Sequence, residues 1–93
     1  MNTHARVAER PLRVDLSHAF IRRTDLSNAN LERANFSFAD CTNAVFRGAN
    51  FKDANFEGTI LKGADLTGAR NLTREQIQRA VIDDHTLLPE GIR

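Results

Sequence analysis

The sequence is poor in the residues that cross-link small proteins or mark a membrane segment. Among its 93 residues are one cysteine, two prolines, no tryptophan and no tyrosine. The lone Cys41 excludes an intramolecular disulfide, so we expect a reducing compartment, the cytoplasm. No apolar run approaches the roughly 20 residues of a membrane-spanning helix, and residues 1–11 lack the apolar stretch of a signal peptide. The formal net charge of +1 predicts neither a nucleic-acid partner nor a membrane partner.

What the sequence has instead is an internal repeat of five residues. Each of eleven consecutive units between residues 14 and 68 begins with a small residue, most often alanine. Two positions later each unit carries a larger apolar residue: Leu16, Ile21, Leu26, Leu31, Phe36, Cys41, Phe46, Phe51, Phe56, Leu61 and Leu66. A helix needs apolar residues about every 3.6 positions, and a strand needs them at every second position. The period of five fits neither, and it predicts a chain that turns a corner in every unit.

Four such corners close a square coil of twenty residues, so successive coils can stack and pair their backbones. The small and the larger apolar residue are two positions apart and therefore point inward together. The residue between them points outward, and in eight units it is Asp or Asn, a type that bonds nearby backbone and tolerates turns. The exceptions are Phe20, Val45 and Ile60. Four units end in glycine, which a corner with positive φ favours: Gly48, Gly58, Gly63 and Gly68.

This pattern resembles the A(D/N)Lxx motif of the pentapeptide repeat family, over residues 14–68 and without an insertion. The resemblance implies an all-β solenoid, the right-handed quadrilateral β-helix, here of just under three coils. Stacking at intervals of twenty residues arranges the larger apolar side chains in four core columns. Cys41 is the smallest of them, and we expect it to be a buried hydrophobe rather than a reactive thiol.

The segment after the repeat, residues 69–93, is predicted to cap the open end of the solenoid. Thr73 and Gln76 have the spacing of a capping box, and the apolar spacing predicts a helix over residues 74–82. The residues expected on its apolar face are Ile77, Ala80 and Val81, and the tail residues expected to complete the plug are Leu72, Leu87, Leu88 and Ile92. We interpret the cap as a monomer plug. The alternative is an end-to-end homodimer contact, because larger members of the family pair through their C-terminal ends.

At the other end, residues 1–13 are expected to form a flexible arm. No side-chain arrangement in the sequence predicts catalysis. Asp83, Asp84 and His85 form the one cluster that could hold a metal ion, but adjacent residues rarely converge on one ion, so a capping turn is the preferred interpretation. We therefore expect a protein that is not an enzyme and that has no metal site, cofactor or small-molecule substrate.

The outward positions carry the functional hypothesis. Three units replace the usual Asp or Asn by an apolar residue, and a fourth apolar side chain falls at an outward corner. With the neighbouring cations, the predicted partner-binding residues are Phe20, Arg22, Arg23, Phe38, Val45, Ile60 and Lys62. An apolar spot rimmed by arginine is typical of protein interfaces. The alternative is that these side chains pack on the N-terminal arm or on the C-terminal tail.

Two functions follow from these observations. The first is a small protein-interaction or scaffold module with an unknown protein partner. The second, implied by the resemblance alone, is DNA mimicry toward a type II topoisomerase such as gyrase, as in quinolone-resistance members of the family. Those proteins are long, strongly acidic dimers, whereas residues 14–68 have a formal charge of about −1 (six Lys or Arg against seven Asp or Glu). The sequence thus favours the interaction module.

Overall fold

The structure, a computed structural model, describes residues 13–92, so the expected arm of residues 1–13 lies outside the described residues except for Arg13. Within this part the one helix is α2, Arg74–Arg79, and the β-structure consists of ten isolated parallel bridges. No helix of the described part has the length and hydropathy that crossing a membrane requires.

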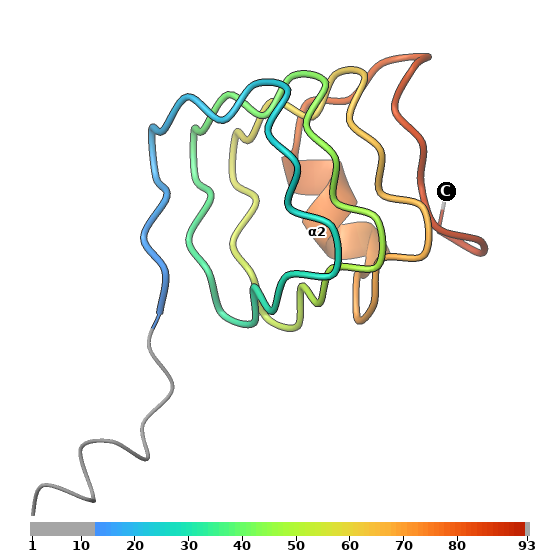
Figure 1. Cartoon of the computed structure of the whole chain (residues 1–93), viewed down its shortest axis with the longest axis horizontal. Coiled ribbons are helices and arrows are strands. Elements are labelled where there is room, and N and C mark those ends of the chain that lie inside the picture. Colours follow the sequence, from blue (N-terminus) through green and yellow to red (C-terminus); the bar gives the residue numbers. More distant parts are fainter. Residues whose placement is uncertain (1–12, 93) are drawn as a thin grey trace, which may run out of the picture.

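Most of the bridges join residues twenty positions apart and stack the chain into coils (Figure 1). Each coil has four sides, and we name the sides by the outward residues that pair along them. The first face carries Asp15, Asn35 and Asn55, and the second carries Phe20, Asp40 and Ile60. The third face carries Asp25, Val45 and Asp65, and the fourth carries Asn30, Asn50 and Arg70.

A tight turn forms each corner of the coil. At the first corner the Ala19 amide donates to the Leu16 carbonyl at 3.1 Å, and His18, the third residue of the turn, has a φ of 61°. Positive φ at that place is a feature of type II turns. The four glycines that end repeat units adopt it, and so do the residues that end the other seven units: His18, Arg23, Asn28, Arg33, Phe38, Asn43 and Asp53. Because L-residues disfavour this conformation, the coil must impose it on those seven.

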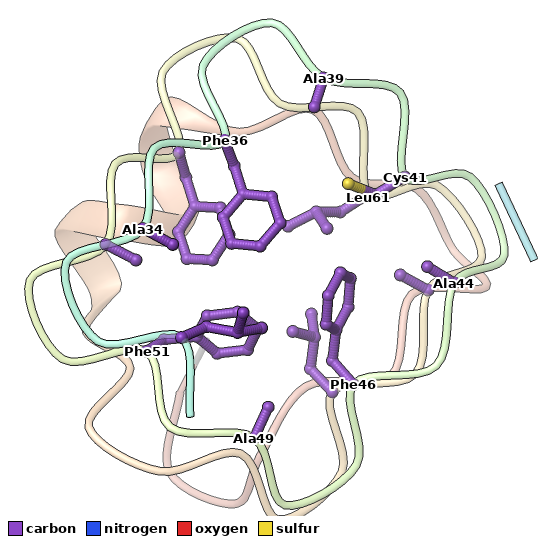
Figure 2. Packing of buried hydrophobic residues seen from close by; sticks show 14 of the residues in the cluster. Ala34, Phe36, Ala39, Cys41, Ala44, Phe46, Ala49, Phe51 and Leu61 are labelled. Atoms are coloured by element: carbon purple, nitrogen blue, oxygen red, sulfur yellow. The ribbon is translucent and has the colours of Figure 1, made fainter. Parts of the chain in front are cut away.

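The core holds the inward residues that the repeat predicts. Figure 2 shows Phe36, Cys41, Phe46 and Phe51 pointing inward from the sides of the coil, and all four are fully buried. The rings of Phe36 and Phe56, one coil apart, stack with their centroids 5.5 Å apart, while Phe51 meets Phe46 edge-on at 5.2 Å. Fully burying such a side chain stabilises a protein by about 1.5–3 kcal/mol, so this cluster holds the coils together.

Helix α2 begins where the capping box predicts. The Thr73 hydroxyl accepts the Gln76 amide at 3.1 Å, and Gln76 Oε1 accepts the Thr73 amide at 2.8 Å. The side-chain amide of Gln76 also donates to the carbonyls of Phe51 and Ala54, at 2.9 and 3.0 Å. In the earlier coils, the carbonyl equivalent to that of Ala54 accepts a backbone amide from the next coil. Gln76 therefore supplies a donor that a further coil would otherwise supply.

The helix ends at Arg79, three residues before the predicted end at residue 82. The cause is the edge of the last coil. The Val81 amide donates to the Thr59 carbonyl at 2.8 Å, and the Val81 carbonyl accepts the Leu61 amide at 2.7 Å. These bonds draw Val81 into an extended bridge with Ile60, so its side chain is 41% exposed instead of lying on an apolar helix face.

Leu87 departs from the expected plug for the same reason. It bridges to Asp65 as a continuation of the third face, and its side chain points outward with 52% exposed. The preceding Thr86 is buried in its place, and its hydroxyl donates to the Leu61 carbonyl at 2.8 Å. The other apolar residues expected in the cap belong to the core or pack against it: Leu72, Ile77, Ala80, Leu88 and Ile92.

Candidate interaction surface

On the outside of the tube, a hydrogen bond between a side chain and the backbone recurs in eight of the eleven units and is missing from three. In all eight units with Asp or Asn, the side-chain oxygen accepts the backbone amide two residues later, at distances from 2.9 to 3.3 Å. Phe20, Val45 and Ile60 have no atom that could accept this bond. A net hydrogen bond contributes about 0.5–1.5 kcal/mol, so each apolar replacement forgoes stability. These three positions are therefore candidates for function.

Phe20 is the most exposed of the three and lies in the first coil of the second face. Its side chain is 86% exposed, whereas Ile60 is half-buried. The bridges place Asp40 between them, so an acidic residue separates the two apolar ones along this face. On its other side Ile60 bridges to Val81 of the C-terminal segment. For Ile60 the alternative of packing on the C-terminal tail therefore applies. No described residue covers Phe20 in this way.

The corner beside Phe20 holds a second aromatic group. The Phe38 ring stacks on the His18 ring with centroids 5.5 Å apart and an interplanar angle of 18°, yet Phe38 remains 56% exposed. It also lies over Gly58, where a Cβ would be 2.5 Å from Phe38 Cδ1. His18 precedes Phe20 by two residues, so this corner adjoins the second face. The repeat pattern alone does not assign His18 to the site, but the interval of twenty residues between His18 and Phe38 indicates that the two lie one above the other.

Three cations flank these aromatic residues. Arg22 Nε lies 3.8 Å from Asp40 Oδ2, and the Arg22 side chain is 57% exposed. The hydroxyl of Thr42 donates to Asp40 at 2.6 Å and is the main cause that lowers the pKa of Asp40, with smaller contributions from Arg22 and Lys62. Arg23 and Lys62 are exposed and form no ion pair with other described residues. The second face therefore carries an excess of positive charge.

We call this region the Phe20 surface; it consists of His18, Phe20, Arg22, Arg23, Phe38, Asp40, Ile60 and Lys62. Six of the seven residues predicted to bind a partner lie on it. Val45 does not, because it lies half-buried on the third face between Asp25 and Asp65. The twenty-residue register separates it from the others.

A groove of about 550 Å³ lies elsewhere, along the first face. Its walls carry Arg13 and Arg33 but also Asp15 and Asp53. Charges of both signs therefore line the groove, with no nucleophile held beside a base. We do not assign a site to it.

The remaining reactive side chains have structural roles. Cys41 is fully buried, and burial raises the pKa of its thiol to about 12, so it is the buried hydrophobe that the repeat predicts. The Asp83 carboxylate accepts the amides of Gly63 and His85, both at 3.0 Å, which forms a capping turn. The described residues contain no group of three His, Cys, Asp or Glu side chains that could hold a metal ion.

A family model described as pentapeptide repeats matches residues 13–40 and 39–70, with eight copies of the repeat. Among solved structures, a pentapeptide repeat protein from the cyanobacterium Cyanothece 51142 is 29% identical with a TM-score of 0.64, and the match covers 80% of this chain and 53% of that one. This chain thus spans about half the length of that protein. No curated protein matches the sequence.

Two further solved structures are more distant. A pentapeptide repeat protein from the Arabidopsis thaliana thylakoid lumen is 20% identical with a TM-score of 0.42, over 78% of this chain and 57% of that one. A pentapeptide repeat protein from Nostoc Pcc 7120 is 24% identical with a TM-score of 0.37, over 87% of this chain and 78% of that one.

Proposed function

The chain belongs to the pentapeptide repeat family, whose members form a right-handed quadrilateral β-helix, and we propose that it is a non-catalytic module that binds another protein through the Phe20 surface. The observation that carries this proposal is Phe20 itself. It exposes 86% of a large apolar side chain, at a position where eight other units use Asp or Asn to make a hydrogen bond. Exposed apolar groups rimmed by polar residues mark interaction sites.

The neighbouring corner supports the same proposal. Phe38 has a φ of 59°, a conformation that costs an L-residue roughly 1–2 kcal/mol and that a bulky side chain seldom adopts. Because the coil imposes positive φ at every corner, the distinguishing feature of Phe38 is a bulky apolar side chain that stays 56% exposed there. Arg22, Arg23 and Lys62 add the cationic rim, and arginine and aromatic residues are enriched at interfaces.

An affinity pull-down tests this function. The bait is the full chain, and the variant combines Phe20→Asp with Arg22→Glu. The matched control combines Asn30→Asp with Lys52→Glu, which makes the same changes of charge on the fourth face. We expect the wild type and the control to recover the same partner and the Phe20 variant to lose it. Recovery of that partner by the Phe20 variant, or of no partner by the wild type, contradicts the proposal.

A further inference from the structure

Along the second face, each coil pairs its backbone with the next one. The Asp40 amide donates to the Ala19 carbonyl, and the Asp40 carbonyl accepts the Ile21 amide, both at 2.8 Å. Ile60 binds the coil before it in the same way. Phe20 occupies the equivalent place in the first coil, and no described residue pairs with its N–H or its C=O. Within residues 13–92 this is an open edge with one unused donor and one unused acceptor.

The interior behind this edge is also incompletely covered. On this side of the first coil Ala19 is half-buried and Ile21 is 9% exposed, whereas their counterparts one coil later, Ala39 and Cys41, are fully buried. A strand placed on the edge would direct alternate side chains inward and outward. Its inward side chains would extend the apolar core, so they must be apolar.

The outward side chains of such a strand would lie beside Phe20, in the same column. The charged residues that follow Phe20 along the chain are the exposed Arg22 and Arg23. Arg22 pairs with Asp40, the only acid of this column in the described residues, and Arg23 forms no ion pair with a described residue. Charge complementarity therefore favours acidic residues at the outward positions.

We propose that the edge at Phe20 binds an extended segment of the partner by strand addition, and that this segment alternates apolar and acidic residues. Main-chain hydrogen bonds then supply affinity, and the alternating side chains supply selectivity. The proposal rests on the function proposed above and specifies how the partner is bound on the Phe20 surface.

The direct probe is a synthetic peptide, acetyl-Asp-Val-Asp-Val-Asp-Val-Asp-amide, added to the isotope-labelled full chain and followed by NMR. Its matched control has Lys in place of every Asp. In the free chain we expect the Phe20 amide to exchange with solvent much faster than the Asp40 and Ile60 amides. The acidic peptide is expected to shift the amide signals of residues 19–23 and to slow exchange of the Phe20 amide, while the basic peptide binds roughly tenfold more weakly.

Two substitutions separate the backbone from the side chain. Phe20→Ala keeps the backbone donor, and Phe20→Pro removes it. Because that amide has no partner among the described residues, we expect the Phe20→Pro chain to fold and to bind the acidic peptide on the order of tenfold more weakly than Phe20→Ala does. Asp25→Pro, at the same edge on the third face, is the control and leaves binding unchanged.

Four results overturn the proposal. The first is a Phe20 amide already protected in the free chain, which shows that the edge is covered by the chain itself or is otherwise in use. The second is a Phe20→Pro chain that does not fold while Asp25→Pro does. The third is absence of peptide-induced shifts at residues 19–23 at millimolar peptide. The fourth is equal binding by Phe20→Ala and Phe20→Pro, which shows that the backbone N–H of residue 20 does not bind the peptide. This result leaves the function proposed above intact, because a partner can still bind through side chains of the Phe20 surface.

Discussion

At the scale of a single residue, Phe20 exposes an aromatic ring at a position where Asp or Asn would stabilise the fold. Replacing it by Asn restores the side-chain acceptor that eight other units use and removes an exposed aromatic ring. We expect Phe20→Asn to raise the free energy of unfolding by about 1 kcal/mol, measured by urea denaturation. The reverse change on the fourth face, Asn30→Phe, loses the bonds that Asn30 makes with Glu32 and Asn50 and lowers it by a similar amount. A loss of stability in Phe20→Asn contradicts this account of the outward positions.

The corner glycines provide a second comparison between single residues. Gly58 and Gly68 have φ values of 64° and 69°, but a Cβ at Gly58 would collide with the Phe38 ring, whereas one at Gly68 has its nearest neighbour at 3.9 Å. We expect Gly68→Ala to cost about 1 kcal/mol through backbone strain alone and Gly58→Ala to cost clearly more. In a Phe38→Ala background the two costs should become equal. Equal costs in the native background indicate that the Phe38 ring does not rest on Gly58.

At the scale of elements, Gln76 links helix α2 to the tube. Glutamate serves equally well in a capping box, but it has no donor for the carbonyls of Phe51 and Ala54. We expect Gln76→Glu to lower the free energy of unfolding by about 2 kcal/mol, and the loss should shrink under acidic conditions that protonate the glutamate. Gln78→Glu, on the exposed side of the same helix, is the control and should change stability little. If both substitutions have the same effect, the helix does not replace coil donors.

The elements also show what the sequence can predict. A period of five identifies the inward residues because a square tube admits one small and one large side chain per side, and the capping box places the start of α2 at Arg74. The end of α2 and the outward direction of Leu87 depend on backbone groups of Thr59, Leu61 and Ala64 at the edge of the last coil, which form hydrogen bonds with Val81 and Leu87. These hydrogen bonds join residues that are far apart in the sequence, so helical spacing does not predict them. The stack of His18 on Phe38 likewise depends on the coil register.

At the scale of the whole molecule, the outer aspartates make stability depend on pH. Hydrogen bonds lower the pKa of five of these carboxyls. At Asp15, Asp25 and Asp40 the largest cause is the hydrogen bond from a Ser or Thr hydroxyl. At Asp65 and Asp83 burial acts in the opposite direction, and the hydrogen bonds together outweigh it. A carboxyl whose pKa is lower in the folded state stabilises the fold above its ordinary pKa, and this contribution is lost as pH falls through the folded value.

We therefore expect the urea midpoint to be insensitive to these groups from neutral pH down to about pH 4 and to fall steadily below it. The double variant Asp15→Asn and Asp25→Asn keeps the side-chain acceptors without the titrating groups, so its midpoint should fall less in acid. A midpoint that rises below pH 4, or a variant that follows the wild type in acid, contradicts the role given to these carboxyls.

The interior of the tube is packed, so a partner must bind the outer surface or the open edge of the first coil. The most direct test places a photo-cross-linking phenylalanine analogue at position 20 or, as the control, at position 30 of the same coil. In cells, we expect position 20 to form one defined adduct that disappears when Arg22→Glu and Arg23→Glu are added, and position 30 to form none. Identical adducts at both positions, or no adduct at position 20, would show that the Phe20 surface is not where this protein binds its partner.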